Sequence, residues 1–210
     1  QRQMCIRDRV TFSTYARIQD HAEHLRTAIE KSLFFVSVVM FPLMTGLILL
    51  SPYIINYFPS WHNKWEPAVI SIIFFSLNAM VSSLSGILVN VLDATGRVKT
   101  TLKLMFFWTI ITWTLTPLLI YFYGYNGVAA ASFLISLTIF ITVFLAKQVV
   151  NFDFIGNIKK PTLAAIIMGI VVYVLAQLFI TSLIMTFAVA ILGGIVYCAV
   201  MYVTAKDEII

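Results

Sequence analysis

The chain has 210 residues, of which 60% are hydrophobic and 11% are charged, and its formal net charge is +5. Soluble domains carry roughly a quarter charged residues. A mean hydropathy of +0.95 is too high for one water-soluble core of this size, because surface-to-volume scaling leaves too little interior. The composition therefore excludes a water-soluble globular protein and predicts a chain that folds in lipid. We expect membrane lipid as a partner and no nucleic acid.

The first nine residues, QRQMCIRDR, are polar and rich in arginine, unlike the rest of the chain. Every complete codon of one back-translation, CAG CGT CAG ATG TGT ATA AGA GAC AGN, matches the transposase adapter of short-read sequencing libraries. We predict that Gln1–Arg9 is a sequencing-adapter artefact, to be left out of fold reasoning; the alternative is a basic juxtamembrane tail. The native gene would then be interrupted at Val10, and we expect a C-terminal fragment whose missing N-terminal half is a partner.

Residues 10–31 are predicted to form a cytoplasmic connector. Over Asp20–Lys31 the apolar residues Ala22, Leu25 and Ile29 share one side of a helix, and charged residues surround the rest. This pattern is typical of an amphipathic helix at a membrane surface. We expect a helix at the cytoplasmic surface, either separate from the first membrane span or continuous with it.

Charge-free stretches predict the spans. A bilayer-spanning helix needs about 20 apolar residues, so two of these stretches hold one span each and two hold a helical hairpin each. The glycines and asparagine of Tyr123–Gly127 give the break in the third stretch, and Thr181 and Ser182 give a weaker break in the fourth. The stretches without Asp, Glu, Lys or Arg are Ser32–Asn63, Pro67–Leu92, Leu104–Ala146 and Pro161–Ala205.

These segments are apolar on all sides and longer than the alternating ten-residue strands of a membrane barrel. Because only helices and closed barrels satisfy their backbone in lipid, we predict an all-α integral membrane protein, a bundle of six transmembrane helices within residues 32–210. The predicted spans cover roughly residues 33–57, 67–92, 102–123, 127–149, 160–179 and 183–204.

Lysine and arginine are unevenly divided between alternate loops. When the three arginines of Gln1–Arg9 are left out, one set of loops holds ten of these residues, and the other holds Lys64 alone. Since cytoplasmic loops carry the excess of Lys and Arg, we predict a multi-pass protein of the cytoplasmic (inner) membrane with both ends of the chain in the cytoplasm. The ten residues are Arg17, Arg26, Lys31, Arg97, Lys99, Lys103, Lys147, Lys159, Lys160 and Lys206.

Four segments carry a more specific arrangement. YARIQDHAEHLRTAIEKS precedes the first span, and FPLMTGLILLSPYIINYF has prolines near its middle and its outer end. WHNKWEPAVISIIFFSLNAMVSSLSGILVNVLDATGRVKTTLKL has Trp and Pro at an outer entrance, a small-residue helix and a DATGR inner turn. YGYNGVAAASFLISL contains a Gly-x-x-Gly-Val-Ala-Ala hairpin. In this arrangement Val10–Val150 resembles the polysaccharide flippases, which share a superfamily with the MATE drug antiporters.

The resemblance implies two lobes of six helices around a central cavity, with this chain in the C-terminal lobe of a MATE-like transporter. It implies that the protein flips lipid-linked oligosaccharide across the cytoplasmic membrane by alternating access, for surface polysaccharide assembly. Two alternatives remain: a MATE-type multidrug or cation antiporter, and a membrane-embedded glycosyltransferase or ligase. The sugar, the coupling ion, the oligomeric state and the place of the last two spans stay open.

Polar side chains on two spans give candidates for a substrate cavity. The second span carries an asparagine and serines on one helical stripe, and the third carries threonines and a tryptophan, which can stack on sugar rings, on one face. The alternatives are helix packing through small residues, and threonines that bond their own backbone beside a lipid-facing or core tryptophan. The candidates are Asn78, Ser82, Ser85, Thr109, Trp113 and Thr116.

Pro42 and Pro117 lie within predicted spans and are hinge candidates, although kinks also occur in static bundles. No charged residue lies at mid-depth of a span, which disfavours an antiporter. His21 and His24 are spaced i, i+3 with no third ligand nearby, so no metal site is predicted. No nucleophile–base or carboxylate pair is present, and we expect neither a cofactor nor enzymatic activity.

Overall fold

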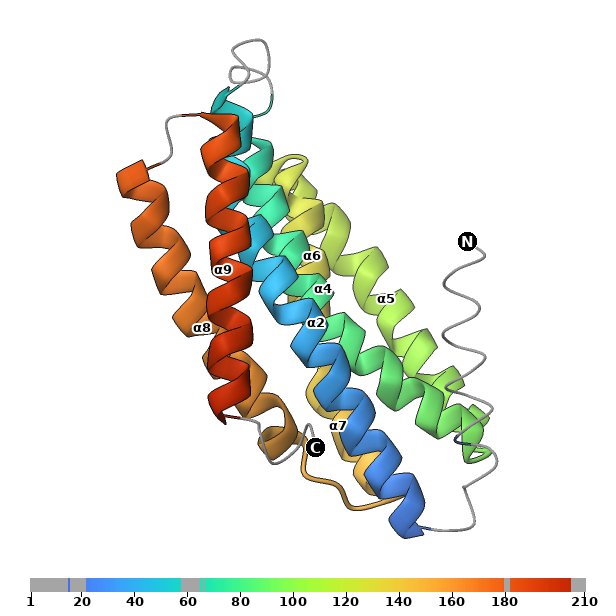
Figure 1. Cartoon of the computed structure of the whole chain (residues 1–210). Helices are drawn as coiled ribbons and strands as arrows, with labels where there is room; N and C mark the ends of the chain where they lie inside the picture. Colours follow the sequence, from blue (N-terminus) through green and yellow to red (C-terminus); the bar gives the residue numbers. More distant parts are fainter. Residues whose placement is uncertain (1–14, 16–21, 58–64, 66, 180–181, 205–210) are drawn as a thin grey trace.

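The structure, a computed structural model, describes residues 15, 22–57, 65, 67–179 and 182–204. The predicted adapter segment Gln1–Arg9 and half of the predicted connector lie outside the described residues. Within them the chain forms seven α-helices and no strand (Figure 1). The helices are α2 (Ala22–Tyr57), α4 (Ala68–Ala94), α5 (Val98–Tyr123), α6 (Asn126–Ser136), α7 (Ile139–Lys147), α8 (Phe154–Phe179) and α9 (Leu183–Thr204).

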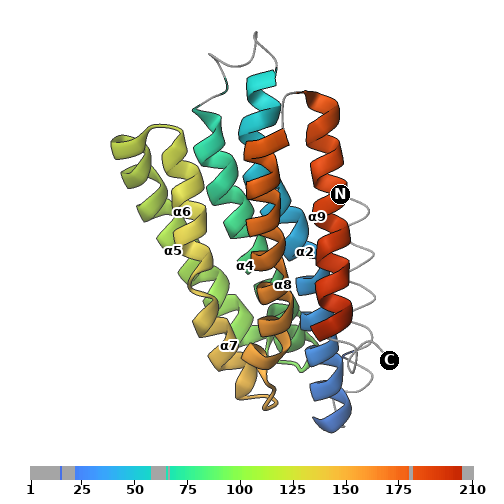
Figure 2. The same cartoon turned by 60° about the vertical axis from the view of Figure 1, so that its left-hand side comes forward.

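Six helical segments of the described chain are long and apolar enough to cross a membrane. Five of them are α2, α4, α5, α8 and α9, and the sixth is the pair α6–α7, which together covers Asn126–Lys147. The helices run alongside one another as long rods (Figures 1 and 2). The predicted all-α bundle of six spans is therefore confirmed.

From Ala22 onward the helix expected for the connector is continuous with the first span as one helix, α2, which is one of the two expected arrangements. Two other features differ from the expected spans. The helix α8 begins at Phe154, ahead of the expected start at residue 160, so that Pro161 lies inside it. A turn at Leu137–Thr138 separates α6 from α7 within the span expected at 127–149.

The helix α2 contacts α4, α8 and α9. Its buried residues Leu25, Ile29, Leu33, Ser37 and Phe41 recur every fourth position, so they line one side of the helix. Helices in lipid gain little from the hydrophobic effect and associate through close packing. Through their contacts with α2, α8 and α9 therefore belong to the same packed bundle as α4.

The hairpin of α5 and α6 forms the edge of the bundle (Figure 2). The helix α5 contacts α6 and, to a lesser extent, α4, and its buried residues are Thr101 and Leu104. Gly124 ends α5 with a φ of 60°, a backbone conformation that side chains with a Cβ rarely adopt. The predicted turn at Tyr123–Gly127 therefore depends on its first glycine.

The described lysines and arginines gather at one end of the bundle, which we call the basic end. This end comprises the start of α2, the α4–α5 turn, the end of α7 and the start of α8. The Arg97 guanidinium donates a hydrogen bond of 3.2 Å to the Gln148 carbonyl and so ties the α4–α5 turn to the end of α7. Exposed aromatic side chains, including Tyr57, Tyr121 and Tyr123, lie toward the opposite end.

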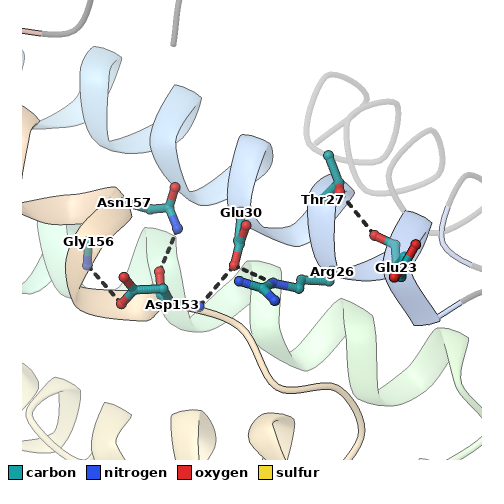
Figure 3. Close-up of polar contacts among 7 residues, drawn as sticks. All are labelled: Glu23, Arg26, Thr27, Glu30, Asp153, Gly156 and Asn157. Atoms are coloured by element: carbon teal, nitrogen blue, oxygen red, sulfur yellow. Dashed lines mark hydrogen bonds and ion pairs between the residues drawn. The ribbon is translucent and has the colours of Figure 1, made fainter. Parts of the chain in front are cut away.

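A carboxylate on α2 holds the linker between α7 and α8 (Figure 3). One Glu30 oxygen accepts hydrogen bonds from the Asp153 backbone N–H, at 2.9 Å, and from Arg26 Nε, at 3.0 Å. The Asp153 carboxylate in turn accepts the Gly156 N–H at 3.0 Å, which caps the first turn of α8. The start of α8 is thereby fixed to a residue on α2.

Replacing Glu30 with Ala is expected to lower the free energy of unfolding by about 1.5 kcal/mol, because the Asp153 N–H loses a charged acceptor. Proteolytic cleavage between α7 and α8 should become faster, which limited proteolysis in detergent would measure alongside thermal unfolding. Glu30→Gln retains a carbonyl acceptor and should restore most of the protection. If Glu23→Ala, an equal loss of charge on the exposed face of α2, accelerates cleavage as much, the bond to Asp153 does not hold the linker.

Candidate functional site

A cavity of about 720 Å³ lies between α4, α5, α6 and the start of α7. Its volume is within the range of small-molecule binding sites. Met40 of α2 also reaches its wall, and the remaining lining residues come from the four helices around it. No Asp, Glu, Lys or Arg is among the described lining residues, so the cavity is polar without charge. The polar lining residues are Asn78, Ser82, Ser83, Ser85, Asn90, Trp108, Thr112, Ser132, Ser136 and Thr138.

The α4 wall contains the predicted stripe. Asn78, Ser82 and Ser85 all line the cavity, as the helical spacing of three and four residues requires for side chains on one face. Gly86 and Asn90 extend the stripe toward the basic end. The structure therefore brings these three predicted residues together on one surface.

The α5 wall differs from the predicted face. Thr109, Trp113 and Thr116 do not line the cavity; Trp113 is 78% exposed, and the Thr109 hydroxyl donates to the Met105 carbonyl of its own helix at 2.8 Å. Trp108 and Thr112 line the cavity in their place. The face of α5 that lines the cavity is therefore shifted by one residue from the predicted face, which corresponds to a rotation of 100° about the helix axis.

The break between α6 and α7 lies at the cavity wall. Trp108 Nε1 donates a hydrogen bond of 2.9 Å to the Thr138 hydroxyl, and this hydroxyl donates to the Ile135 carbonyl at 2.7 Å. The backbone N–H of Thr138 also bonds the Ile135 carbonyl, at 3.0 Å, which is the tighter three-residue turn of a 3₁₀-helix. An indole on α5 therefore supports the local change in helix geometry.

The two sides of the cavity have different hydrogen-bonding capacity. The hydroxyls of Thr112, Ser132 and Ser136 donate to carbonyls of their own helices, so they offer only lone pairs to a ligand. Within the described chain, the side-chain amides of Asn78 and Asn90 make no hydrogen bond, so each side chain offers donors and an acceptor. The α4 wall is therefore the side on which a ligand finds unused donors.

The hinge candidates Pro42 and Pro117 lie inside α2 and α5. Neither residue lines the cavity. A proline inside a helix removes one backbone hydrogen bond and favours a kink. The hinge role of both residues stays a prediction.

Comparison with known proteins gives two matches. A family model described as polysaccharide biosynthesis protein matches residues 5–70, less than half of the chain. Among solved structures, the lipid II flippase MurJ in its inward closed conformation aligns with a TM-score of 0.80 and 21% sequence identity. The alignment covers 97% of this chain and 43% of that flippase. No curated protein sequence matches the chain.

At this identity the structural likeness shows a shared fold. Because the alignment covers nearly all of this chain, the shared fold includes α8 and α9 as well as the helices around the cavity. The chain spans less than half the length of the flippase. The all-α membrane fold expected for the chain is therefore confirmed and is shared with that flippase, and the family match at residues 5–70 covers all of α2 and the first residues of α4.

Proposed function

We propose that this chain takes part in moving lipid-linked oligosaccharide across the cytoplasmic membrane, for the assembly of a surface polysaccharide. The observation that carries the proposal is the fold shared with a lipid II flippase over 97% of the chain. The match of residues 5–70 to a polysaccharide biosynthesis family supports the same substrate class. Fold alone does not determine function, so the substrate is inferred from these two matches together.

The cavity suits the sugar part of such a substrate. Sugar hydroxyls both donate and accept hydrogen bonds, and Asn78 and Asn90 have unused capacity of both kinds. We propose Asn78, Ser82 and Ser85 as substrate-contacting residues, with Trp108 as the aromatic surface in place of Trp113. The pyrophosphate of a lipid-linked sugar would need a cation, and the described lining offers none.

Alternating access would need the helices around the cavity to move. Pro42 and Pro117 interrupt the backbone hydrogen bonding of α2 and α5 and are the proposed bending points. Such movement carries a polar head group between membrane faces while its lipid tail stays in the bilayer. It requires no covalent chemistry from the chain.

Loss of the gene that encodes this chain is expected to trap lipid-linked repeat units on the inner leaflet of the cytoplasmic membrane. The surface polysaccharide should fall in parallel, which leaflet-specific labelling of the lipid-linked sugar and staining of the cell surface would measure. A MATE-type antiporter predicts the opposite: greater drug sensitivity with unchanged surface polysaccharide. A glycosyltransferase or ligase predicts incomplete or unattached sugars in place of trapped repeat units.

We further propose that the basic end faces the cytoplasm, because cytoplasmic loops carry the excess of Lys and Arg. A reporter fused after Tyr125, at the α5–α6 turn, is then expected to be periplasmic. A reporter fused after Gln148, past α7, should be cytoplasmic. Exchanged locations for the two reporters would reverse the orientation without changing the fold.

A further inference from the structure

One side of the first half of α8 packs on the bundle. Pro161 lies inside this helix and is fully buried, and Ala164 and Ala165 are buried on the same side.

Beside this buried side lies an apolar groove of about 350 Å³, here called the α8 groove. All of its lining residues come from the first half of α8. They form two adjacent rows in which residues recur every fourth position: Phe154, Ile158, Thr162 and Ile166 in one row, and Ile155, Lys159 and Leu163 in the other. Its apolar side chains are accessible, with Ile155 73% and Ile166 57% exposed. The Thr162 hydroxyl donates to the Ile158 carbonyl at 2.8 Å, so it adds no unused donor.

A single cation accompanies this apolar lining. Lys159 lies on the groove and is exposed, and within the described chain it forms no ion pair. Helical side chains lean toward the N-terminus of their helix, and long lysine side chains extend to the membrane interface. The start of α8 belongs to the basic end, so the Lys159 ammonium extends toward the level of the lipid head groups.

The acid nearest in sequence is already engaged. Asp153 is the sole carboxylate between residues 148 and 178. Its carboxylate accepts the Gly156 N–H at 3.0 Å, and its backbone N–H is held by Glu30 (Figure 3). The negative charge of Asp153 therefore remains at the first turn of α8, and Lys159 is available to an external anion.

We infer that the α8 groove binds one acyl chain of an anionic phospholipid whose phosphate pairs with Lys159. The apolar lining fits a hydrocarbon chain, and basic pockets at this level of a membrane protein attract anionic head groups. The inference rests on α8 alone and does not require the proposed transport function. It makes this lipid a bound partner and distinguishes it from the lipids that surround the other helices.

Native mass spectrometry of the detergent-purified protein tests the site with phosphatidylglycerol and phosphatidylcholine. Phosphatidylglycerol is expected to bind at least fivefold more tightly. Lys159→Gln should weaken phosphatidylglycerol binding about fivefold, the contribution of one lysine beside an anionic head group, and leave phosphatidylcholine unchanged. Lys159→Arg should retain the preference. The matched control Lys99→Gln removes an exposed charge from α5 at the same end of the bundle and should have no effect.

Leu163→Trp tests the groove apart from the charge, because the larger ring fills the apolar lining and should abolish tight binding in a protein that still unfolds at the wild-type temperature. Equal binding of the two lipids, equal losses in Lys159→Gln and Lys99→Gln, or full binding in a folded Leu163→Trp variant would each overturn the site. Displacement of phosphatidylglycerol by an equal concentration of polyprenyl phosphate would assign the groove to the lipid carrier. Dimers that exclude phosphatidylglycerol would assign it to a second copy of the chain.

Discussion

Replacing Gly127 with Ala is expected to lower the free energy of unfolding by about 3 kcal/mol, the upper part of the range for overpacked sites. A Cβ at this position would lie 2.2 Å from the Leu119 carbonyl oxygen and 2.7 Å from the Ile120 backbone nitrogen. Both neighbours are backbone atoms of α5, so no side-chain rotation relieves the clash. The α5–α6 hairpin would have to open, and thermal unfolding in detergent measures the loss.

Gly194→Ala is the matched control, because nothing lies within 4 Å of a Cβ built at that position in α9. Alanine favours a helix more than glycine does, so this variant should be neutral or slightly more stable. Opening of the hairpin should also lengthen the 2.6 Å contact in which the Ser71 hydroxyl donates to the Asn126 side-chain oxygen. Equal effects of the two substitutions would mean that the α5–α6 approach does not limit stability.

The bundle could be predicted from the sequence because its main signal is strong. Charge-free stretches of defined length allow few alternatives in lipid, and the glycine at position 124 marks a turn that other residues disfavour. The break at Leu137–Thr138 has no such signal, since no Gly or Pro lies there. It coincides with the hydrogen bond from Trp108, a contact with another helix. Local sequence carries no information about such a contact.

The stripe on α4 was predictable because polar residues recur on one face of an otherwise apolar helix. On α5 two neighbouring faces carry the same chemistry: Trp108 and Thr112 on one, Thr109 and Trp113 on the other. Sequence spacing fits both faces equally. The choice depends on how α5 packs against α6, which places Trp108 in the cavity and leaves Trp113 exposed.

The last two helices show a similar limit. As apolar segments, α8 and α9 contain no motif that indicates a partner. In the structure both contact α2 and each other, and a small residue allows the approach of α9 to α8: a Cβ on Gly193 would lie 2.5 Å from the Val172 side chain. Packing through small residues is typical of helices in lipid, but the sequence alone does not show which glycine meets which helix.

Under the proposed transport function, replacing Asn78 with Leu is expected to slow translocation of lipid-linked oligosaccharide about tenfold. The amide has unused donors and an acceptor at the cavity wall, and leucine, of similar size, offers neither to a sugar hydroxyl. Loss of one such hydrogen bond in a partly enclosed site costs about 1–2 kcal/mol, and 1.4 kcal/mol corresponds to a factor of ten in rate. The rate at which labelled repeat units reach the outer leaflet, in cells that express the intact protein, measures the effect.

Three companion variants make this result specific. Asn151→Leu makes the same chemical change at an exposed position in the α7–α8 linker and should leave the rate unchanged. Trp113→Phe alters the face of α5 that points away from the cavity and should also be neutral, whereas Trp108→Phe removes the donor to Thr138 and should slow translocation. Normal translocation in Asn78→Leu together with a loss in Trp113→Phe would move the sugar path to the outer face of α5. The cavity between α4, α5 and α6 would then serve helix packing alone.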